Sequence, residues 1–325
     1  NLNFNTGYVT YIKNSLLLSN GISIALGSHS LYWNTINSSQ ELKTVSGSAT
    51  ITANGGYAIY AGYGGTGQTV AIGSGITLQG ATYLSNSSAA TIVNNGTLNF
   101  TGSSSIGLTT FTNNGTVSAS SGTLSTSGTT FNNNSAINIT GGATINASVT
   151  NWNNNSGGNV NVTNGSFNFS GSTLVNNAGG MTLASGSTLT LGGNYTLAEL
   201  TTYLGGSNFT RAAGSTVNLS GTLTNTGNTL DVGSAGIFKT GGLNVLSGTI
   251  VGGTLVNTDA TPNFTSQYGT LDGVTLGSNL NFNTGYATYI KNSLLLSNGI
   301  SVALGNHSLY WNTINASQEL KTVSG

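Results

Sequence analysis

The chain has almost no charge. Only 4% of its 325 residues are charged, six of them acidic and six basic, so the formal net charge is zero. A chain without a basic patch offers no electrostatic attraction to a nucleic acid or to an anionic membrane, and we expect neither partner. Intrinsic disorder is also disfavoured, because Val, Ile, Leu and Thr are plentiful and favour β-structure.

Cysteine is absent, and the one proline is Pro262. Without cysteine the chain has neither a disulfide framework nor a thiolate metal site. No apolar run is long enough to span a bilayer, so we expect no membrane insertion in this segment. No secretion signal is recognisable, and we expect one to lie elsewhere in a longer protein.

What the chain does contain is a copy of its own beginning. Residues 279–325 repeat residues 1–47, and the offset is 279 − 1 = 278 positions. The four differences are Val9/Ala287, Ile24/Val302, Ser28/Asn306 and Ser38/Ala316. We interpret residues 1–278 as one tandem-repeat unit of a continuous solenoid and residues 279–325 as the start of the next, near-identical unit. Further copies of the repeat in the same chain are then its first expected partner.

A second period, of roughly 20–23 residues, runs through residues 93–192. When successive segments of this length, here called lines, are written one below another, like residues fall into columns. The predicted core columns are Phe111, Phe131 and Trp152, then Val117, Ile137 and Val160, then Leu124, Ile145 and Phe167. A polar column is predicted to form a ladder of amide hydrogen bonds, and its members are Asn114, Asn134, Asn155 and Asn177.

Each line reads as one coil of a β-solenoid. Short runs such as Ile137-Asn-Ile139 alternate apolar and polar residues, as half-buried strands do. Gly and Asn-Gly steps between the runs suit tight corners. Coils stack ~4.8 Å apart, so stacked like charges would repel, which explains the scarcity of charge. We predict an all-β fold with about 20–27 residues per coil, interrupted by a helical or looped excursion at 197–204.

Several segments also carry a family resemblance. These segments are NNGTLNFTG (94–102), YTLAELTTYL (195–204), GTLTNTGNTLDVG (221–233), GTIVGGTLVN (248–257) and GTLDGVTLGSNLNF (269–282). They resemble giant bacterial tandem-repeat surface proteins related to filamentous haemagglutinins and autotransporter passenger domains. The resemblance implies a right-handed parallel β-helix, secretion, and roles in adhesion, biofilm or surface filaments. The near absence of charge departs from that family and puts a polyanion-binding role in doubt.

Residues that could carry a reaction are few and scattered. Glycoside hydrolysis needs two carboxylates ~5–10 Å apart. Asp231 and Asp272, about two coils apart, are the pair that could approach, and Lys239 is the one basic residue within reach. We favour turn residues and exposed polar corners for these positions and expect no enzymatic activity.

Metal sites find equally little support. A calcium β-roll needs a repeated Gly-Gly-x-Gly-x-Asp line, and GGTG at 64–67 lacks the aspartate. His29 recurs as His307, but no Cys and no second His accompany it within the unit. A metal site needs several converging ligands, so we expect a corner or rim histidine and neither a metal nor a cofactor.

The best surface candidate is aromatic. Tyr57, Tyr60 and Tyr63 cluster in sequence, with Tyr32 and Trp33 one coil earlier. Exposed aromatic rings stack on sugar rings, so these three tyrosines are candidate glycan contacts. The interpretation that we favour is that the rings stack on one another between coils.

These patterns predict a structural function. We expect an extracellular filament or stalk, formed by a giant secreted repeat protein and supporting adhesion or cell-surface and biofilm architecture. One alternative is an adhesin that binds surface glycans through its aromatic residues. The other is a laterally self-associating fibre or sheath, in which neighbouring filament chains are partners because no charge repels them.

Overall fold

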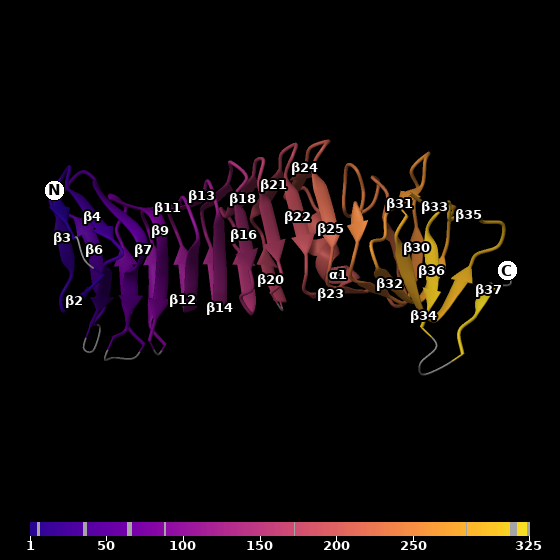
Figure 1. The fold of residues 1–325 in the computed structure, drawn as a ribbon, viewed down its shortest axis with the longest axis horizontal. Coiled ribbons are helices and arrows are strands. Elements are labelled where there is room, and N and C mark those ends of the chain that lie inside the picture. The colour runs from indigo at the N-terminus through magenta and orange to yellow at the C-terminus, as the bar shows by residue number, and fades with distance from the viewer. Residues whose placement is uncertain are drawn as a thin grey trace. The chain divides into compact units, whose positions relative to one another are not determined.

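The structure of the protein is a computed structural model. It describes residues 1–4, 7–34, 38–63, 67–87, 89–171, 173–283, 285–312 and 317–323, with the backbone alone at 173–177. Parallel strands stack on one another as the coils of a β-solenoid (Figure 1). The predicted all-β class and parallel β-solenoid are therefore confirmed.

The chain divides into two compact parts. The first part comprises Asn1–Phe167 and Leu174–Thr182, and the second comprises Asn168–Thr173 and Leu183–Gly325. The division falls far from residue 278, and the second copy of the repeat lies entirely in the second part. That the coils stack continuously from one part to the other stays a prediction. The boundary between two repeat units at residue 278 also stays a prediction.

The strands are short, with a few longer ones that pass through a corner. Those up to residue 170 are β1 Leu2–Asn3, β2 Val9–Ile12, β3 Leu16–Leu18, β4 Ser23–Gly27, β5 Ser30–Trp33, β6 Gln40–Thr44, β7 Ala49–Ala61, β8 Thr69–Ile72, β9 Ile76–Asn86, β10 Thr91–Asn94, β11 Thr97–Phe100, β12 Ser104–Asn113, β13 Thr116–Ala119, β14 Thr123–Asn133, β15 Ala136–Ile139, β16 Thr144–Ala147, β17 Asn151–Asn154, β18 Asn159–Val162 and β19 Ser166–Phe169.

The remaining strands are β20 Thr173–Asn177, β21 Gly180–Leu183, β22 Thr188–Leu191, β23 Asn194–Thr196, β24 Phe209–Arg211, β25 Thr216–Leu219, β26 Thr222–Thr224, β27 Thr229–Asp231, β28 Val245–Leu246, β29 Thr249–Val251, β30 Thr254–Val256, β31 Asn263–Phe264, β32 Gly269–Leu276, β33 Leu280–Phe282, β34 Ala287–Leu296, β35 Val302–Ala303, β36 Ser308–Trp311 and β37 Leu320–Thr322.

Alternation along each strand builds the core. In β11, β13, β15 and β16 every second residue is buried and the residues between are half-exposed. This is the pattern that a strand with one face towards a core must show, because successive side chains point to opposite faces. The apolar members of the runs seen in the sequence are therefore the inward-facing ones.

Parallel register then aligns the buried residues of successive coils. In the first part β7, β9, β12 and β14 lie side by side (Figure 1). One inward column runs through Leu2, Ile24, Ile51, Leu78, Leu98, Val117, Ile137 and Val160. Val117, Ile137 and Val160 were predicted to share a column, and this prediction is confirmed.

The aromatic column is confirmed as well. Phe111 is paired with Phe131, and Phe131 with Trp152, and all three are at most 2% exposed. The rings of Phe131 and Trp152 stack with centroids 4.5 Å apart. In the third column Leu124 is paired with Ile145, and Phe167 is buried. Stacked rings of this kind add attraction to the burial of apolar area.

Coil length varies more than the sequence period indicated. Leu98 is paired with Val117, 19 positions later, whereas Gln40 is paired with Val70, 30 positions later. The predicted 20–27 residues lie inside these limits. The regular period belongs to the middle of the first part, where Val117 and Ile137 are 20 positions apart.

Glycine is required where corners of successive coils touch. A Cβ atom on Gly115 would lie 2.1 Å from the carbonyl oxygen of Gly96 in the coil before it. Real Cβ atoms do not approach an oxygen so closely, so a side chain here would push the two coils apart. The Asn-Gly steps at Gly96 and Gly115 thus mark close approaches of backbone to backbone, whereas Gly21 and Gly55 have open space there and a positive φ.

The second part contains the only helical residues among those described. The helix α1, Leu197–Leu200, begins with a capping box in which Thr196 and Glu199 exchange hydrogen bonds, and a single π-helical turn follows at Thr201–Gly205. This confirms the predicted excursion at 197–204. No helix in the described ranges is long and apolar enough to cross a membrane.

A buried arginine holds an irregular coil in the second part. Between β27 and β28 the chain forms turns, and Arg211 on β24 donates hydrogen bonds to the carbonyl oxygens of Phe238 (2.8 Å), Gly242 (2.6 Å) and Ser215 (2.9 Å). Burial lowers the pKa of this guanidinium to about 10. The cation therefore satisfies backbone groups that no neighbouring strand pairs with.

Replacing Phe131 by Ala should destabilise the middle of the first part. Removing a buried ring costs about 3–5 kcal/mol, whereas Phe131→Leu should cost about 1 kcal/mol. Because solenoids open locally, the measurement is hydrogen exchange of residues 111–162. We expect exchange to accelerate more than about 100-fold in Phe131→Ala. Unchanged exchange in that variant would contradict the stacked core.

Candidate functional site

The structure places Asp231 and Lys239 on one cavity of about 320 Å³, and the carboxylates of Asp231 and Asp259 both lie beside Gly233. Asp231 accepts hydrogen bonds from the Gly233 amide (2.8 Å) and the Thr258 hydroxyl (2.6 Å), and Asp272 forms an ion pair with Lys291 (2.8 Å). The third residue of the predicted candidate set, Lys239, donates to the carbonyl oxygen of Gly205. Asp272 is only 9% exposed, so its predicted place at an exposed corner was wrong.

The histidine predicted at a corner or rim lies at the corner between β4 and β5, but it is buried. His29 is 5% exposed, its Nε2 lies 2.9 Å from the Thr10 hydroxyl, and its ring stacks on Phe4 with centroids 4.5 Å apart. These contacts make it a packed core residue that joins two coils. No group of three or more His, Cys, Asp or Glu side chains among the described residues is placed to hold a metal ion. Of the GGTG line, Gly64, Gly65 and Thr66 lie outside the described residues.

Six tyrosines form one continuous aromatic surface on the first part, which we call the tyrosine flank. They project from β2, β5, β7 and β9 and the turn after β7, and their members are Tyr11, Tyr32, Tyr57, Tyr60, Tyr63 and Tyr83. Parallel register places Tyr11 beside Tyr32, and Tyr32 beside Tyr60. The flank therefore arises from the same alignment of like residues that builds the core.

The rings of the flank pack against one another. Tyr32 and Tyr60 stack with centroids 4.6 Å apart, and Tyr11 and Tyr63 lie at 4.9 Å. The favoured interpretation of inter-coil stacking is thus confirmed for Tyr60, whereas Tyr57 and Tyr63 make tilted contacts with tyrosines of other coils, Tyr57 with Tyr83 and Tyr63 with Tyr11 and Tyr32. Trp33 was placed in the same surface cluster by the sequence, and this was wrong because its side chain is fully buried.

The flank nevertheless presents ring surface to solvent. Tyr11 is 50% exposed and Tyr63 is 41% exposed, while Tyr32, Tyr57 and Tyr60 are half-buried. Burial raises the pKa of Tyr32, and neighbouring phenols raise it further. The hydrogen bond with Tyr63 is the main cause that raises the pKa of Tyr11. The raised pKa values favour the neutral phenols of Tyr11 and Tyr32.

The predicted amide ladder is present on the solvent side. Asn134 Nδ2 donates to Asn114 Oδ1 (2.7 Å), and Asn155 Nδ2 donates to Asn134 Oδ1 (2.6 Å). Asn95 extends the ladder by one coil, because it accepts a hydrogen bond of 3.0 Å from Asn114. Asn177 was the fourth predicted member, and its side chain lies outside the described residues.

A second ladder, which the sequence reasoning missed, lies one residue earlier and is buried. Asn94, Asn113 and Asn133 each donate through Nδ2 to the next Oδ1, the last acceptor being Asn154, and all three distances are 2.8 Å. These four side chains are at most 1% exposed. The remaining donor of Asn113 reaches the carbonyl oxygen of Ala136. The Asn-Asn doublets of the sequence were the signal that could have revealed it.

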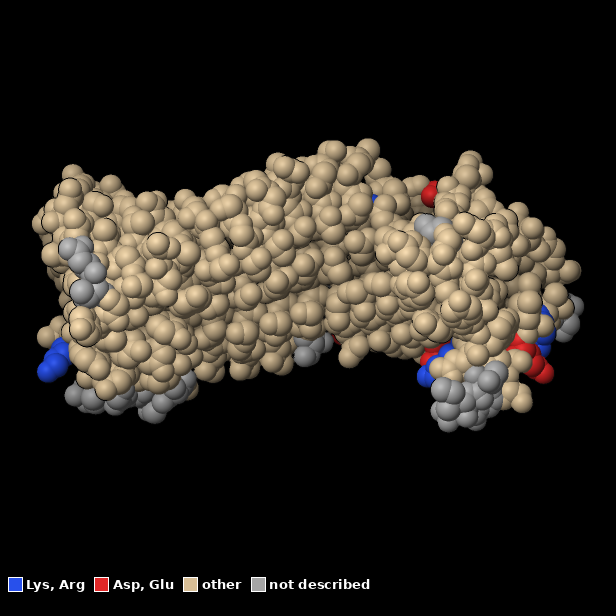
Figure 2. All heavy atoms as spheres, viewed as in Figure 1, with Lys and Arg blue, Asp and Glu red and all other residues tan. Residues whose placement is uncertain are grey.

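Charge is scarce on the molecular surface. Figure 2 shows a face made almost entirely of uncharged atoms, with charged ones gathered mainly where β34 and β37 lie. Three ion pairs are present in the described residues, namely Glu41–Lys43, Asp272–Lys291 and Glu319–Lys321. The lysine beside Glu319 lowers the pKa of that carboxyl. What distinguishes this surface is thus aromatic and amide groups rather than charged ones.

Comparisons with known proteins give no assignment. No family model, curated protein or solved structure matches the chain. The resemblance to filamentous haemagglutinins and autotransporter passenger domains therefore stays a prediction.

Asn113→Ala and Asn114→Ala form a matched pair that separates the buried ladder from the exposed one. Asn113→Ala leaves a donor of Asn94 and an acceptor of Asn133 unsatisfied in the core, at a cost of about 1–3 kcal/mol for each group. Asn114→Ala lets water replace the lost partners, so the cost should stay below about 1 kcal/mol. Urea unfolding followed by circular dichroism measures both. Equal effects of the two substitutions would contradict a stabilising role of the buried ladder.

Proposed function

We propose that the chain is a structural component of an extracellular filament or stalk, formed by a giant secreted protein of tandem repeats. The observation that carries this proposal is one local structure that recurs at an offset of 278 residues. Thr10 lies 2.9 Å from the ring nitrogen of His29, and Thr288 lies 2.9 Å from that of His307.

The recurrence extends to pairing and charge. β2 is paired with β5 at an offset of 21 positions, and β34 with β36 at the same offset. Glu41 and Lys43 form an ion pair of 2.6 Å, and their counterparts Glu319 and Lys321 form one of 2.7 Å. A sequence that forms the same coil each time it occurs can extend a solenoid by repetition, and a stalk requires such an extended structure.

The physical properties of the coils support a mechanical role. Parallel hydrogen bonding, buried columns and the Asn ladders all connect one coil to the next, so each coil is stabilised by its neighbours. Few of the contacts between coils are ion pairs. Because salt screens ion pairs, the contacts between coils should depend little on salt concentration. No group of three or more His, Cys, Asp or Glu side chains in the described ranges is placed to hold a metal ion, and the proposal is of a non-enzymatic protein.

The proposed place of action is the cell surface, where the filament would support adhesion or biofilm architecture. Its partners are further copies of the repeat in the same chain. A laterally associated fibre with neighbouring chains is the alternative arrangement, because an uncharged surface does not repel another copy.

Electron microscopy of cells that produce the protein, labelled with antibodies to residues 48–278, tests this proposal. We expect surface filaments one chain wide that lengthen by ~60 Å for each added repeat, the height of about 12 coils. Their length should be the same at ~0.1 M and ~1 M salt. Label confined to the cell interior would contradict the proposal, and bundles several chains wide would favour the fibre.

A glycan-binding adhesin is the second candidate function, and the exposed rings of the tyrosine flank favour it. Tyr11 and Tyr63 combine exposed ring faces with neighbours that hold the rings in place. A fixed, uncharged aromatic surface suits the apolar face of a sugar ring.

Calorimetric titration with cellohexaose and chitohexaose tests this candidate. If the flank binds either sugar, Tyr63→Ala should weaken binding about two- to twelvefold, since an aromatic contact contributes about 0.5–1.5 kcal/mol. Tyr268→Ala is the matched control, because Tyr268 is 56% exposed and lies outside the flank. Equal losses in both variants, or no binding of either sugar by the unaltered chain, would rule these ligands out.

A further inference from the structure

The first coil of the chain has an uncovered edge. Among the described residues β1 is paired with β4, β2 with β5 and β3 with β6, and each of these three strands has no partner on its other side. Unpaired strand edges present free amide and carbonyl groups that accept a further strand.

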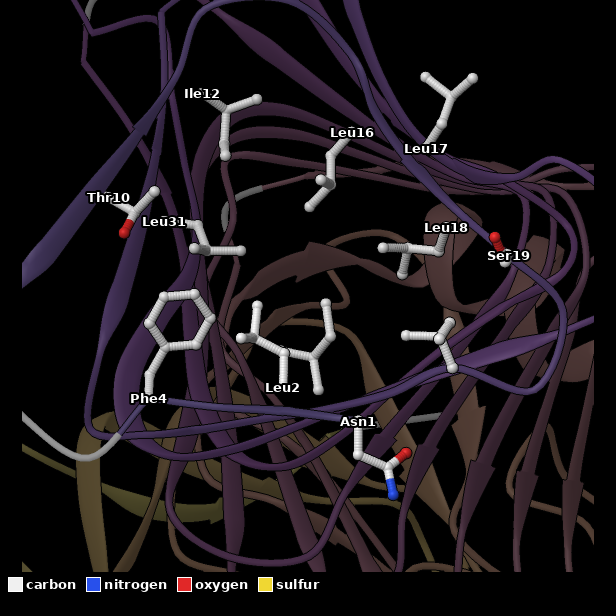
Figure 3. Close-up of a pocket in the computed structure, with 12 residues that line it drawn as sticks. Asn1, Leu2, Phe4, Thr10, Ile12, Leu16, Leu17, Leu18, Ser19 and Leu31 are labelled. Carbon is white, nitrogen blue, oxygen red and sulfur yellow. The ribbon is translucent and has the colours of Figure 1, made fainter.

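The uncovered edge is also apolar. A cavity of about 490 Å³ opens there, and Figure 3 shows Leu2, Phe4, Ile12, Leu16 and Leu18 around its centre. Leu2 is 52% exposed, although it belongs to an inward column whose other members are buried. An apolar surface of this kind, next to open strand edges, is typical of a docking face.

The second copy of the repeat shows the same residues covered. Counting 278 positions on from Leu2, Phe4, Ile12 and Leu16 gives Leu280, Phe282, Ile290 and Leu294. Their exposed fractions are 1%, 4%, 0% and 1%. The sequence is unchanged at these positions, so the difference in burial comes from what lies on the coil.

The residues that cover the second copy come from the coil before it. β31 is paired with β33, which brings the ring of Phe264 within 5.6 Å of the ring of Phe282. β32 is paired with β34 along its length, with Leu271 beside Ile290 and Leu276 beside Leu296. Residues 263–276 thus form a lid whose shape and register match the beginning of a repeat.

Charge complementarity points to the same occupant. Asp272 in the lid is paired with Lys291 at 2.8 Å and accepts a hydrogen bond from Asn292. The counterparts of these two residues in the first copy are Lys13 and Asn14, and both are exposed. A preceding lid would give Lys13 a carboxylate partner in a position that only one register allows.

We propose that the N-terminal face formed by residues 1–4 and 7–18 is a docking site for residues 263–276 of a preceding copy of this chain. Leu271 would lie beside Ile12, Phe264 beside Phe4, and Asp272 beside Lys13, as their counterparts do in the second copy. This inference rests on the proposed array of repeats. The inference adds that no capping segment separates two repeats. The last coil of one repeat and the first coil of the next are then paired as two coils inside a repeat are.

Hydrogen exchange tests the junction in two steps. In the chain as it is, residues 279–296 should exchange at least about 100-fold more slowly than the near-identical residues 1–18. In a longer chain, with residues 1–278 placed before residues 1–325, the segment 1–18 occurs twice. Its mass envelope should then split into two equal halves, one fast and one slow.

Two substitutions in the inner copy of the longer chain sharpen the test. Leu2→Lys should return the slow half to fast exchange, because the counterpart of Leu2 is buried. Tyr11→Lys is the control and should leave it slow, because Tyr289, the counterpart of Tyr11, is 38% exposed and its ring contacts Tyr310 of the following coil rather than the lid.

A single fast envelope in the longer chain, with residues 279–296 still slow, would overturn the junction, since folding of the coils is then verified in the same molecule. Loss of the slow half in both Leu2→Lys and Tyr11→Lys would also overturn the pairing proposed. Neither result concerns surface labelling, so failure of the junction and failure of the filament proposal are distinguishable.

Discussion

In-register stacking of parallel coils is the constraint on which the rest of the structure depends. It places each side chain ~4.8 Å from its counterpart in the next coil, so a residue must tolerate its own kind as a neighbour. Aliphatic and aromatic side chains do so by burial and stacking, as Phe131 and Trp152 show. Asparagine does so because its amide both donates and accepts. A carboxylate or an ammonium group does not, and the core columns, the ladders and the lack of charge follow from this one rule.

The same rule decides how much could be predicted from the sequence. Where coils keep a period near 20 residues, counting alone identified the column of Val117, Ile137 and Val160 and the exposed ladder at Asn114 and Asn134. The buried ladder was missed because each line carries two adjacent asparagines and the period does not distinguish them. Alternation does: Phe111 points inward, so Asn113 points inward and Asn114 outward.

Residues outside the regular period were beyond such reasoning. His29 and Trp33 lie where coils run from 21 to 30 residues, and there the inward positions depend on where each corner falls. Arg211 is a stronger case. Its acceptors include Phe238 and Gly242, 27 and 31 positions away in a segment without strands. A lone arginine in such a sequence reads as a surface residue, and only the irregular fold around it explains why it is buried.

Stacking also constrains the length of the repeat. A unit that follows a copy of itself must end in an edge that pairs with its own beginning, so its length has to be a whole number of coils. A slip of one residue would turn Leu271 and Leu276 away from the core, because side chains alternate along a strand. The pair of Asp272 and Lys291 adds a polar contact that is satisfied in one register. Substitutions that keep the pattern, such as Ile24/Val302, are compatible with this condition. An array built this way changes its length by whole repeats.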